Sequence, residues 1–472
     1  MVQSSEAHEH PSSSSPEKPH CIVIGGGFAG TTAAVRLTEA GWRVTLVEAR
    51  EHLGGRVQSL TDGTTGETID NGQHLMMGCY DAALGLLQTL GTAPLMRRQK
   101  ALRVWFAEVL DGVPTTFCLD ASLAPGKIGV LLGMMRLHGL SWREKLRLVR
   151  FAARLQLNLI KPYGKTAQTL LREEQQSERV ITRLWEPIIL ATLNTSVQTS
   201  SATLFVEVMR IAFLGRAEAS QMLIAETGLD AVLATAPAWL EERDSTVVKG
   251  IVETILVKEN QVQIKQICGV RLKTGEILAT DVVVSAVPLH TLTKLLSPED
   301  LTIAALPNTE RFSPSPIVSV YLWFDKEFIE QDFIALLGTT VQWVFNRRKL
   351  CRAETSVVER FPCHLSLTVS AAETFARASA QDIIKHCVEE LAAVFPASRS
   401  ARLLHARVIR ETNATPLLTP ENEHIRPKAQ TPLQGLFLAG DWTNTGLPAT
   451  IESAARSGEI AALAVINTST FH

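Results

Sequence analysis

Short runs of apolar, mostly β-branched residues flank a helical pattern near the start of the chain. Residues 21–24 and 44–47 are such runs, and residues 30–40 between them have the apolar spacing of a helix. A third run of this kind lies at residues 282–284. Because two parallel strands are joined through a helix, this pattern predicts a doubly wound parallel sheet.

The middle of the chain has a different pattern. Residues 81–240 are mostly helical in their apolar spacing, whereas residues 317–324 and 365–369 alternate or are β-branched. A chain of 472 residues has room for two or three folding units. We therefore expect a parallel α/β domain that is interrupted by a second, mixed α+β domain.

The first twenty residues are rich in Ser, Pro, His and Glu and contain no apolar stretch. This composition is typical of a disordered tail, so we predict one over residues 1–20, and it excludes a secretory signal peptide. No run of about 18 apolar residues follows, so no membrane span is expected. We expect a cytoplasmic protein.

Charge and cysteine content exclude further classes. The 46 basic and 48 acidic residues nearly cancel, so no overall field attracts nucleic acid. The seven cysteines are scattered and form no C-x-x-C motif, which favours reduced thiols over disulfides and predicts no metal site.

A glycine motif follows the first predicted strand. Gly25, Gly27 and Gly30 have the G-x-G-x-x-G spacing, and Glu48 ends the second predicted strand. The first glycine permits a tight turn, the second lets backbone N–H groups approach a pyrophosphate, and the third lets helix and strand pack closely. Glu48 would accept hydrogen bonds from ribose hydroxyls, which disfavours a 2′-phosphate. Together they predict a Rossmann-like dinucleotide site.

Two further motifs favour FAD over NAD. Gly54, Gly55 and Arg56 combine a close-approach backbone with a cation that could reach the pyrophosphate. Near the C-terminus, Gly440 and Asp441 end an apolar run, and a helix opened by a proline follows. Asp441 could bind a ribityl hydroxyl, and the start of that helix could face the flavin. Thr450 and Ile451 lie at that start.

These three motifs in order resemble the FAD-dependent amine oxidase and phytoene desaturase superfamily. The resemblance implies an FAD-binding domain assembled from residues 21–80, 241–300 and 405–472, and a substrate domain from residues 81–240 and 301–404. It also implies a strand over residues 245–255, from which Val252 offers its backbone to the adenine. Cys387 is the nearest cysteine before Gly440 and is far from it, so we expect FAD to bind noncovalently.

Residues 70–80, 184–195 and 440–454 narrow the resemblance to the hopanoid-associated hydroxysqualene dehydroxylases. This implies a lipophilic isoprenoid substrate and reductive removal of its hydroxyl to give squalene, using reduced FAD, in the cytosol or at the cytosolic face of the membrane. An oxidative polyprenoid desaturase or an amine oxidase remains the alternative on the same fold, and a non-enzymatic scaffold is a third. No second G-x-G-x-x-G is present, so the electron donor is a diffusible molecule or a partner protein.

No strong catalytic constellation is visible, but three residues are candidates. Asp70 and His74 lie four residues apart in a glycine-containing loop, which the resemblance places beside the isoalloxazine. His74 is one candidate proton donor, and Asp70 is a donor or its orienting partner. In the alternative, Asp70 caps a turn and His74 binds backbone. Glu186 precedes a proline in an apolar stretch and is either a buried acid or a solvated residue at a helix start.

A basic segment stands out in this nearly neutral chain. Residues 127–154 contain seven Lys or Arg and a single acidic residue, Glu144. Ser141 and Glu144 form a capping-box pattern that starts a predicted helix over residues 141–155. Its arginines at 143, 147, 150 and 154 share one face, next to apolar residues. We expect this helix to hold the protein peripherally at an anionic membrane; the alternative is a solvated basic face.

Overall fold

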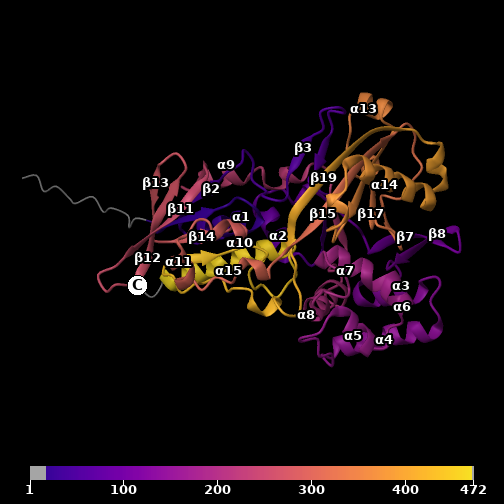
Figure 1. Cartoon of the computed structure of the whole chain (residues 1–472), viewed down its shortest axis with the longest axis horizontal. Helices are drawn as coiled ribbons and strands as arrows, with labels where there is room; N and C mark the ends of the chain where they lie inside the picture. Colours follow the sequence, from indigo (N-terminus) through magenta and orange to yellow (C-terminus); the bar gives the residue numbers. More distant parts are fainter. Residues whose placement is uncertain (1–17, 470–472) are drawn as a thin grey trace, which may run out of the picture.

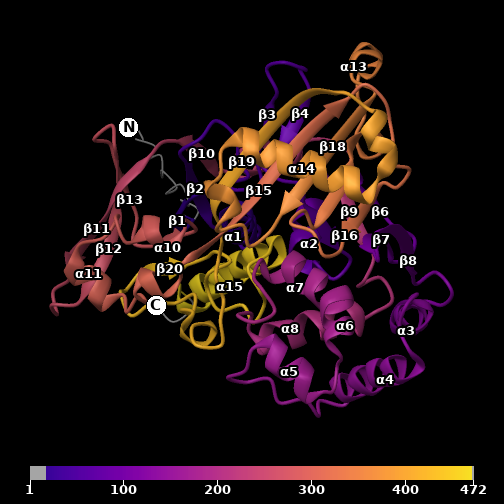
Figure 2. The same ribbon diagram turned by 45° about the vertical axis from the view of Figure 1, so that its right-hand side comes forward.

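The computed structural model describes residues 18–469, which form two halves joined side by side (Figures 1 and 2). One half contains a parallel sheet, an adjoining antiparallel sheet and the C-terminal helix. The other contains a large antiparallel-rich sheet above a group of helices. The predicted tail lies outside the described residues up to residue 17; its last residue, His20, is already in a strand.

Five parallel strands form the first sheet, in the order β10-β2-β1-β14-β20. The predicted strands at residues 21–24, 44–47 and 282–284 correspond to β1, β2 and β14, and the predicted helix to α1. These apolar strands are buried on both faces, as a sheet covered by helices requires. The bounds are β1 His20–Ile24, α1 Phe28–Glu39, β2 Arg43–Glu48, β10 Thr246–Lys249, β14 Val283–Ser285 and β20 Leu436–Leu438.

The strand expected over residues 245–255 is wrong as a single element. The structure has two strands there, because the chain leaves the parallel sheet after β10. The Gly250 amide donates to the backbone carbonyl of Glu48 at 2.8 Å, and β11 then enters a separate sheet in the order β11-β12-β13. The bounds are β11 Val252–Glu259, β12 Lys265–Leu272 and β13 Ile277–Ala279.

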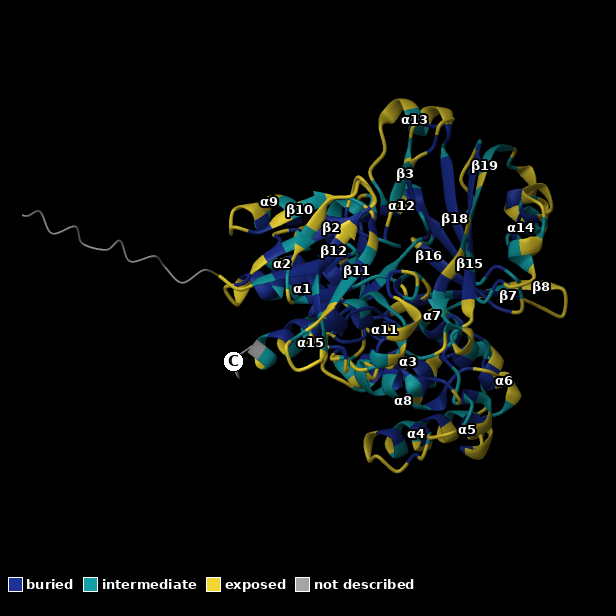
Figure 3. Ribbon diagram, turned by 60° about the vertical axis from the view of Figure 1, so that its left-hand side comes forward, coloured by how far each residue is buried: buried dark blue, intermediate teal, exposed yellow. Residues whose placement is uncertain are grey.

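The second half contains a seven-stranded sheet in the order β19-β15-β18-β17-β16-β7-β8. The predicted strand segments at residues 317–324 and 365–369 lie within β15 and β18. The hairpin β7–β8 corrects the mainly helical expectation for residues 81–240. Figure 3 shows the buried strands of this sheet in dark blue. The bounds are β7 Arg103–Leu110, β8 Val113–Asp120, β15 Pro314–Phe324, β16 Phe333–Leu336, β17 Trp343–Asn346, β18 Cys363–Val369 and β19 Leu403–Pro416.

Helices between residues 126 and 213 pack below this sheet (Figure 1). Two of them, η2 and η3, are single π-helical turns. The predicted basic helix is α4, and its capping box is formed as expected. The bounds are α3 Gly126–Arg136, α4 Trp142–Gln156, α5 Ala167–Glu173, α6 Glu178–Val180, η2 Ile181–Trp185, α7 Glu186–Leu193, α8 Ala202–Val208 and η3 Met209–Phe213.

Helix α2 (Asp81–Thr89) was expected in the substrate domain, but it packs with the FAD-binding half. Its buried residues Ala83, Leu86 and Leu87 share a core with α1 and α15 (Ile451–Ser469). A β-carbon on Gly458 would lie 2.2 Å from the carbonyl oxygen of Ala29, so this glycine is needed for close packing of α15 on α1. Within residues 18–469 no helix is long and apolar enough to cross a bilayer.

Candidate active site

The glycine loop is a layer of tightly packed backbone. A β-carbon on Gly30 would lie 1.8 Å from the carbonyl oxygen of Gly25, so only glycine fits there. The Gly54 amide donates to the Gly26 carbonyl at 2.8 Å, which joins the first glycine motif to the second. A β-carbon on Gly27 would meet nothing closer than 3.8 Å, so the space beside Gly27 stays open.

The start of α1 is suited to bind an anion. Gly27 is its N-cap residue; no side chain caps the helix, and no acidic residue lies in its first turn. The first backbone N–H groups of a helix have no intrahelical partner and carry the positive end of the helix dipole. With the open side of Gly27, this arrangement fits the pyrophosphate of a dinucleotide.

Glu48 closes one side of this loop. Its buried carboxylate accepts from the Gly26 amide at 2.7 Å and from the Arg50 amide at 2.9 Å. The carboxylate is therefore held at the end of β2, where a ribose would lie in a sheet of this topology. Val252, the predicted adenine contact, is buried at the start of β11, two residues after the bond that joins Gly250 to Glu48.

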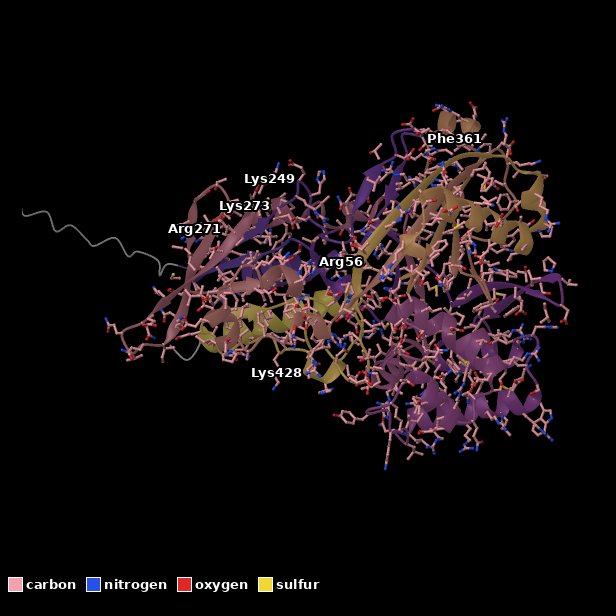
Figure 4. All side chains as sticks on the ribbon, viewed as in Figure 1. Arg56, Lys249, Arg271, Lys273, Phe361 and Lys428 are labelled. Carbon is pink, nitrogen blue, oxygen red and sulfur yellow. The ribbon has the colours of Figure 1, made fainter. Side chains whose placement is uncertain are left out.

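An ion pair brings the second and third motifs together. Arg56 donates to Asp441 Oδ1 at 2.7 Å and to the backbone carbonyl of Ala414 at 2.7 Å. Figure 4 shows Arg56 at the junction of the two halves. The adjacent Gly55 and Gly440 have φ angles of +62° and +135°, which L side chains rarely adopt. The structure thus joins residues that are 385 positions apart in the sequence.

Arg426, a functional candidate that the sequence did not indicate, fixes the loop after β20 by hydrogen bonds. Its buried guanidinium donates to the carbonyls of Leu447 at 2.7 Å and of Asp441 at 2.9 Å. Burial lowers the pKa of Arg426 to about 10, so it remains a cation at neutral pH. No local pattern in the sequence marks this residue, because its partners are backbone carbonyls.

Helix α15 begins at Ile451, three residues after the proline that was expected to open it. Thr450 accepts from the Ser453 amide at 3.2 Å and so caps the first turn. Glu452, which was not singled out from the sequence, accepts from the amides of Ala82 and Ala83 at 3.2 and 3.0 Å. These bonds fix the start of α15 against the start of α2.

Three groups donate hydrogen bonds to the side chain of Asp70. They are the Ser59 hydroxyl at 2.8 Å, the Leu229 amide at 3.0 Å and the buried guanidinium of Arg347 at 3.2 Å. Both carboxyl oxygens act as acceptors in this arrangement, which favours Asp70 as an acceptor over a role as the proton donor. Its role as an orienting residue stays a prediction.

The charges of Arg56 and Asp70 both affect the pKa of His74. Its Nδ1 is 2.6 Å from the carbonyl oxygen of Gly72. Burial is the main cause that lowers the pKa of His74, and the Arg56 charge adds to it, whereas Asp70 and the Gly72 carbonyl oppose it. The neutral ring therefore donates from Nδ1 and presents an unprotonated Nε2. The backbone-binding alternative is thus realised, and a proton-donor role would require a second proton on Nε2.

Glu186 lies at the start of α7 and is half-buried. Burial raises the pKa of its carboxyl group, as expected for a candidate acid. Among the described residues, no hydrogen bond joins it to Asp70 or His74, and burial is the only cause of its raised pKa.

A pocket of about 410 Å³, counting its open mouth, borders the start of α15. Thr450, Glu452 and Tyr80 line one side, and apolar residues of η3 line another. Burial raises the pKa of Glu452 above its usual range, although its bonds to α2 oppose this shift. Tyr80 is the last residue of the motif at residues 70–80, so this motif is the sequence signal that could have placed Tyr80 in the site.

Residues 28–466 match the family described as "Flavin containing amine oxidoreductase". The chain belongs to this family. It is an FAD-dependent oxidoreductase, and the predicted cofactor and fold class are confirmed. The oxidoreductase from Methanosarcina mazei has the same fold, with a TM-score of 0.68 at 16% identity over 95% of this chain and all (100%) of that one. Putrescine oxidase gives a TM-score of 0.69 at 15% identity, covering 96% and 99% of the two chains.

Members of this family that act on isoprenoids are similar over nearly the whole chain. The hydroxysqualene dehydroxylase of Rhodopseudomonas palustris is 30% identical, covering 93% of this chain and 96% of its own. That of Sinorhizobium fredii is 29% identical, covering 96% and 100%. The 15-cis-phytoene desaturase of an Oncidium hybrid is 26% identical, covering 96% and 78%. The expected resemblance to hydroxysqualene dehydroxylases is therefore confirmed.

Proposed function

We propose that this protein removes the hydroxyl group of hydroxysqualene reductively and releases squalene and water. The observation that carries the proposal is full-length similarity to two hydroxysqualene dehydroxylases at 30% and 29% identity, above the 26% identity to a phytoene desaturase. Polyprenoid desaturation is the second candidate, because that relative also matches 96% of this chain.

The reaction consumes two electrons and two protons for each hydroxyl lost as water. Reduced FAD, when bound, supplies the hydride that replaces the leaving group at carbon. The start of α1, Glu48 and the Arg56–Asp441 pair hold the cofactor and fix its orientation. A separate donor, diffusible or protein, must return electrons to the flavin after each turnover.

A protonated hydroxyl is a far better leaving group, so an acid is required at the allylic alcohol. Glu186 and His74 are the candidates. Burial raises the pKa of Glu186, so it retains its proton to higher pH than usual. His74 would need a second proton on Nε2, which its burial and the Arg56 charge oppose by lowering its pKa. His74→Gln and Glu186→Gln separate them. The variant that lacks the true acid should lose roughly 10²–10⁴-fold in the single-turnover rate, with flavin content unchanged.

The activity is tested by anaerobic incubation of photoreduced protein with hydroxysqualene in detergent micelles. Extraction and mass spectrometry should find squalene, and the oxidised protein should form none. Conversion of phytoene by the oxidised protein, without squalene from the reduced protein, would instead support the desaturase candidate.

We also propose that the protein binds an anionic membrane surface peripherally, through α3, α4 and the loop after α4. Large apolar side chains are exposed there, among them Trp142 at 70%, Leu146 at 59% and Leu157 at 66% exposure. Exposed basic residues lie among them, including Lys127, Arg143 and Arg147. Apolar insertion combined with attraction to anionic headgroups is the usual basis of peripheral membrane binding.

The arginine stripe expected on α4 is not uniformly free. Arg154 pairs with the buried Glu174 at 2.8 Å, and Arg150 donates to Gln175 at 3.1 Å, so both are engaged with the segment after α5. Arg143 and Arg147 remain for headgroups. Arg143→Gln with Arg147→Gln should weaken the affinity for phosphatidylglycerol vesicles, measured by co-sedimentation, by roughly thirtyfold, at about 1 kcal/mol per basic residue. Sedimentation equal to that of the parent protein would contradict the membrane proposal.

A further inference from the structure

A second pocket, of about 340 Å³ counting its open mouth, lies between α3, α4 and η3. Its lining is apolar except for Lys127, whose side chain is exposed and lies 3.5 Å from Gln156 Oε1 at the end of α4. The floor includes Trp185, Phe151 and Met209, which are all buried. A space lined in this way has no polar partners for water and favours an apolar ligand.

Two glycines let α3 pack closely on one side of the pocket's surroundings. Gly129 and Gly133 face β8 and the segment that follows it, where β-carbons would lie 1.9 Å from the Ala124 carbonyl oxygen and 2.9 Å from that of Asp120. The helix therefore lies directly on backbone through its glycine side. Val130 and Met134, each one residue after a glycine and so about 100° further around the helix, line the pocket.

The π-helical turn η3 separates this pocket from the one beside α15. In η3 the Leu214 amide donates to the Met209 carbonyl at 3.0 Å, five residues back along the chain. Met209 and Phe213 line the pocket under α3, whereas Ile211 and Ala212 line the pocket that borders Thr450. Single π turns inside helices occur frequently at functional sites.

We propose that the pocket between α3, α4 and η3 binds one end of a linear isoprenoid chain. This inference rests on the proposed function, which supplies a hydrocarbon substrate of that shape. The exposed side chains of Ile128 and Leu132 on α3 lie on the same helix as the pocket, so a chain leaving a bilayer can enter it along apolar surface. The wall formed by η3 then lies between the chain end and the start of α15.

The pocket is tested with Ala152→Phe, which fills it, and with Ala153→Phe as the matched control. Ala152 lines the pocket, whereas the adjacent Ala153 is exposed on the same helix. The probe is squalene in detergent micelles, and its retention by the purified, oxidised FAD-bound protein is measured by gas chromatography. A phenyl group displaces several methylenes of bound chain, so Ala152→Phe should weaken retention at least roughly tenfold. Ala153→Phe should retain squalene as the parent does.

Equal retention by both variants would overturn the inference. Flavin absorbance and the thermal midpoint report whether each variant is folded, and Leu131→Trp, at another lining position, replaces Ala152→Phe if that variant does not fold. Squalene binding needs no turnover, so the two proposals fail separately. Selective loss of binding in Ala152→Phe without any dehydroxylation would refute the proposed function alone, whereas dehydroxylation with equal retention would refute the pocket alone.

Discussion

Different kinds of contact stabilise the two halves of the molecule. In the FAD-binding half the critical contacts are between backbone atoms, as where Gly30 packs on Gly25 and Gly54 bonds to Gly26. Where residues 59–70 meet the large sheet of the other half they are buried ion pairs, Arg347 with Asp70 and Arg348 with Glu67. A β-carbon at Gly30 should therefore not be tolerated, and neither should the loss of one partner of these ion pairs.

The difference follows from what each half must do. A cofactor with a pyrophosphate needs free N–H groups at close range, which side chains would block. The two short strands within residues 59–70 must instead be fixed to the large sheet. Glu67 and Asp70 of this segment pair with Arg348 and Arg347, which directly follow β17. Breaking a buried pair leaves an uncompensated charge, which costs far more than the pair contributes.

The largest effect is expected at the glycine loop. Gly27→Val with Glu48→Ala should abolish FAD retention, because the valine side chain occupies the open space beside Gly27. The apoprotein should still fold, since a β-carbon at Gly27 meets no atom closer than 3.8 Å. Flavin absorbance and circular dichroism measure the two properties, and normal flavin content would refute the proposed site. Gly30→Val, in contrast, should impair folding itself.

Removal of Arg347 should have the next largest effect. Arg347→Met leaves the buried carboxylate of Asp70 without its charge partner, which should cost about 3–5 kcal/mol of the free energy of unfolding. The double variant with Asp70→Asn should cost less, since no isolated charge remains. Urea denaturation of the three proteins checks the order, and equal losses in the single and double variants would contradict it.

A buried histidine should make the substrate half sensitive to acid. His364 stacks on Trp323 with ring centroids 4.2 Å apart, and burial lowers its pKa to about 4. The unfolded chain, with a histidine pKa near 6.5, binds more protons below that pH, so stability is lost as the pH falls from about 6.5 toward 4. Between pH 6.5 and 5 this amounts to about 1.5 kcal/mol.

The histidine contribution can be isolated with His364→Gln, which does not titrate. Its urea midpoint should change less between pH 6.5 and 5 than that of the parent. Glu67 contributes little to this slope, because a carboxyl group whose pKa is lowered by folding loses its contribution only as the pH falls through the unfolded pKa, near 4.5. Parallel slopes for the two proteins would show that His364 is not responsible.

The smallest effect is expected at the capping box of α4. Ser141 accepts from the Glu144 amide at 3.3 Å, and the Glu144 carboxylate accepts from the Ser141 amide at 2.8 Å. Ser141→Ala should cost about 1 kcal/mol of unfolding free energy and leave flavin content unchanged. Loss of flavin in this variant would show that the two halves are more strongly coupled than their separate contacts indicate.

The same contrast explains what could be predicted from the sequence. The glycine loop and Glu48 follow from local spacing, since their partners lie within one strand-helix-strand unit. Arg56 and Asp441 were each identified, but their pairing required the fold. The Arg347–Asp70 pair joins residues 277 positions apart and has no periodic signal, so the hydrogen-bond donors around Asp70 could not be inferred.

The helical region shows the same limit. The capping box of α4 is local and was predicted correctly, whereas the partners of Arg150 and Arg154 on the segment after α5 were not. The two π turns and the pockets beside them depend on how distant helices pack. No pattern in a single segment predicts such spaces.

The most direct test of the central claim is the stoichiometry and isotope content of a single turnover. Photoreduced protein in D₂O is mixed anaerobically with hydroxysqualene, flavin reoxidation is followed by absorbance, and the extracted hydrocarbon is analysed by mass spectrometry. We expect one squalene per reoxidised flavin, with one deuterium at the carbon that carried the hydroxyl. Flavin that stays reduced, or squalene formed without deuterium, would contradict hydride transfer from the flavin to the substrate.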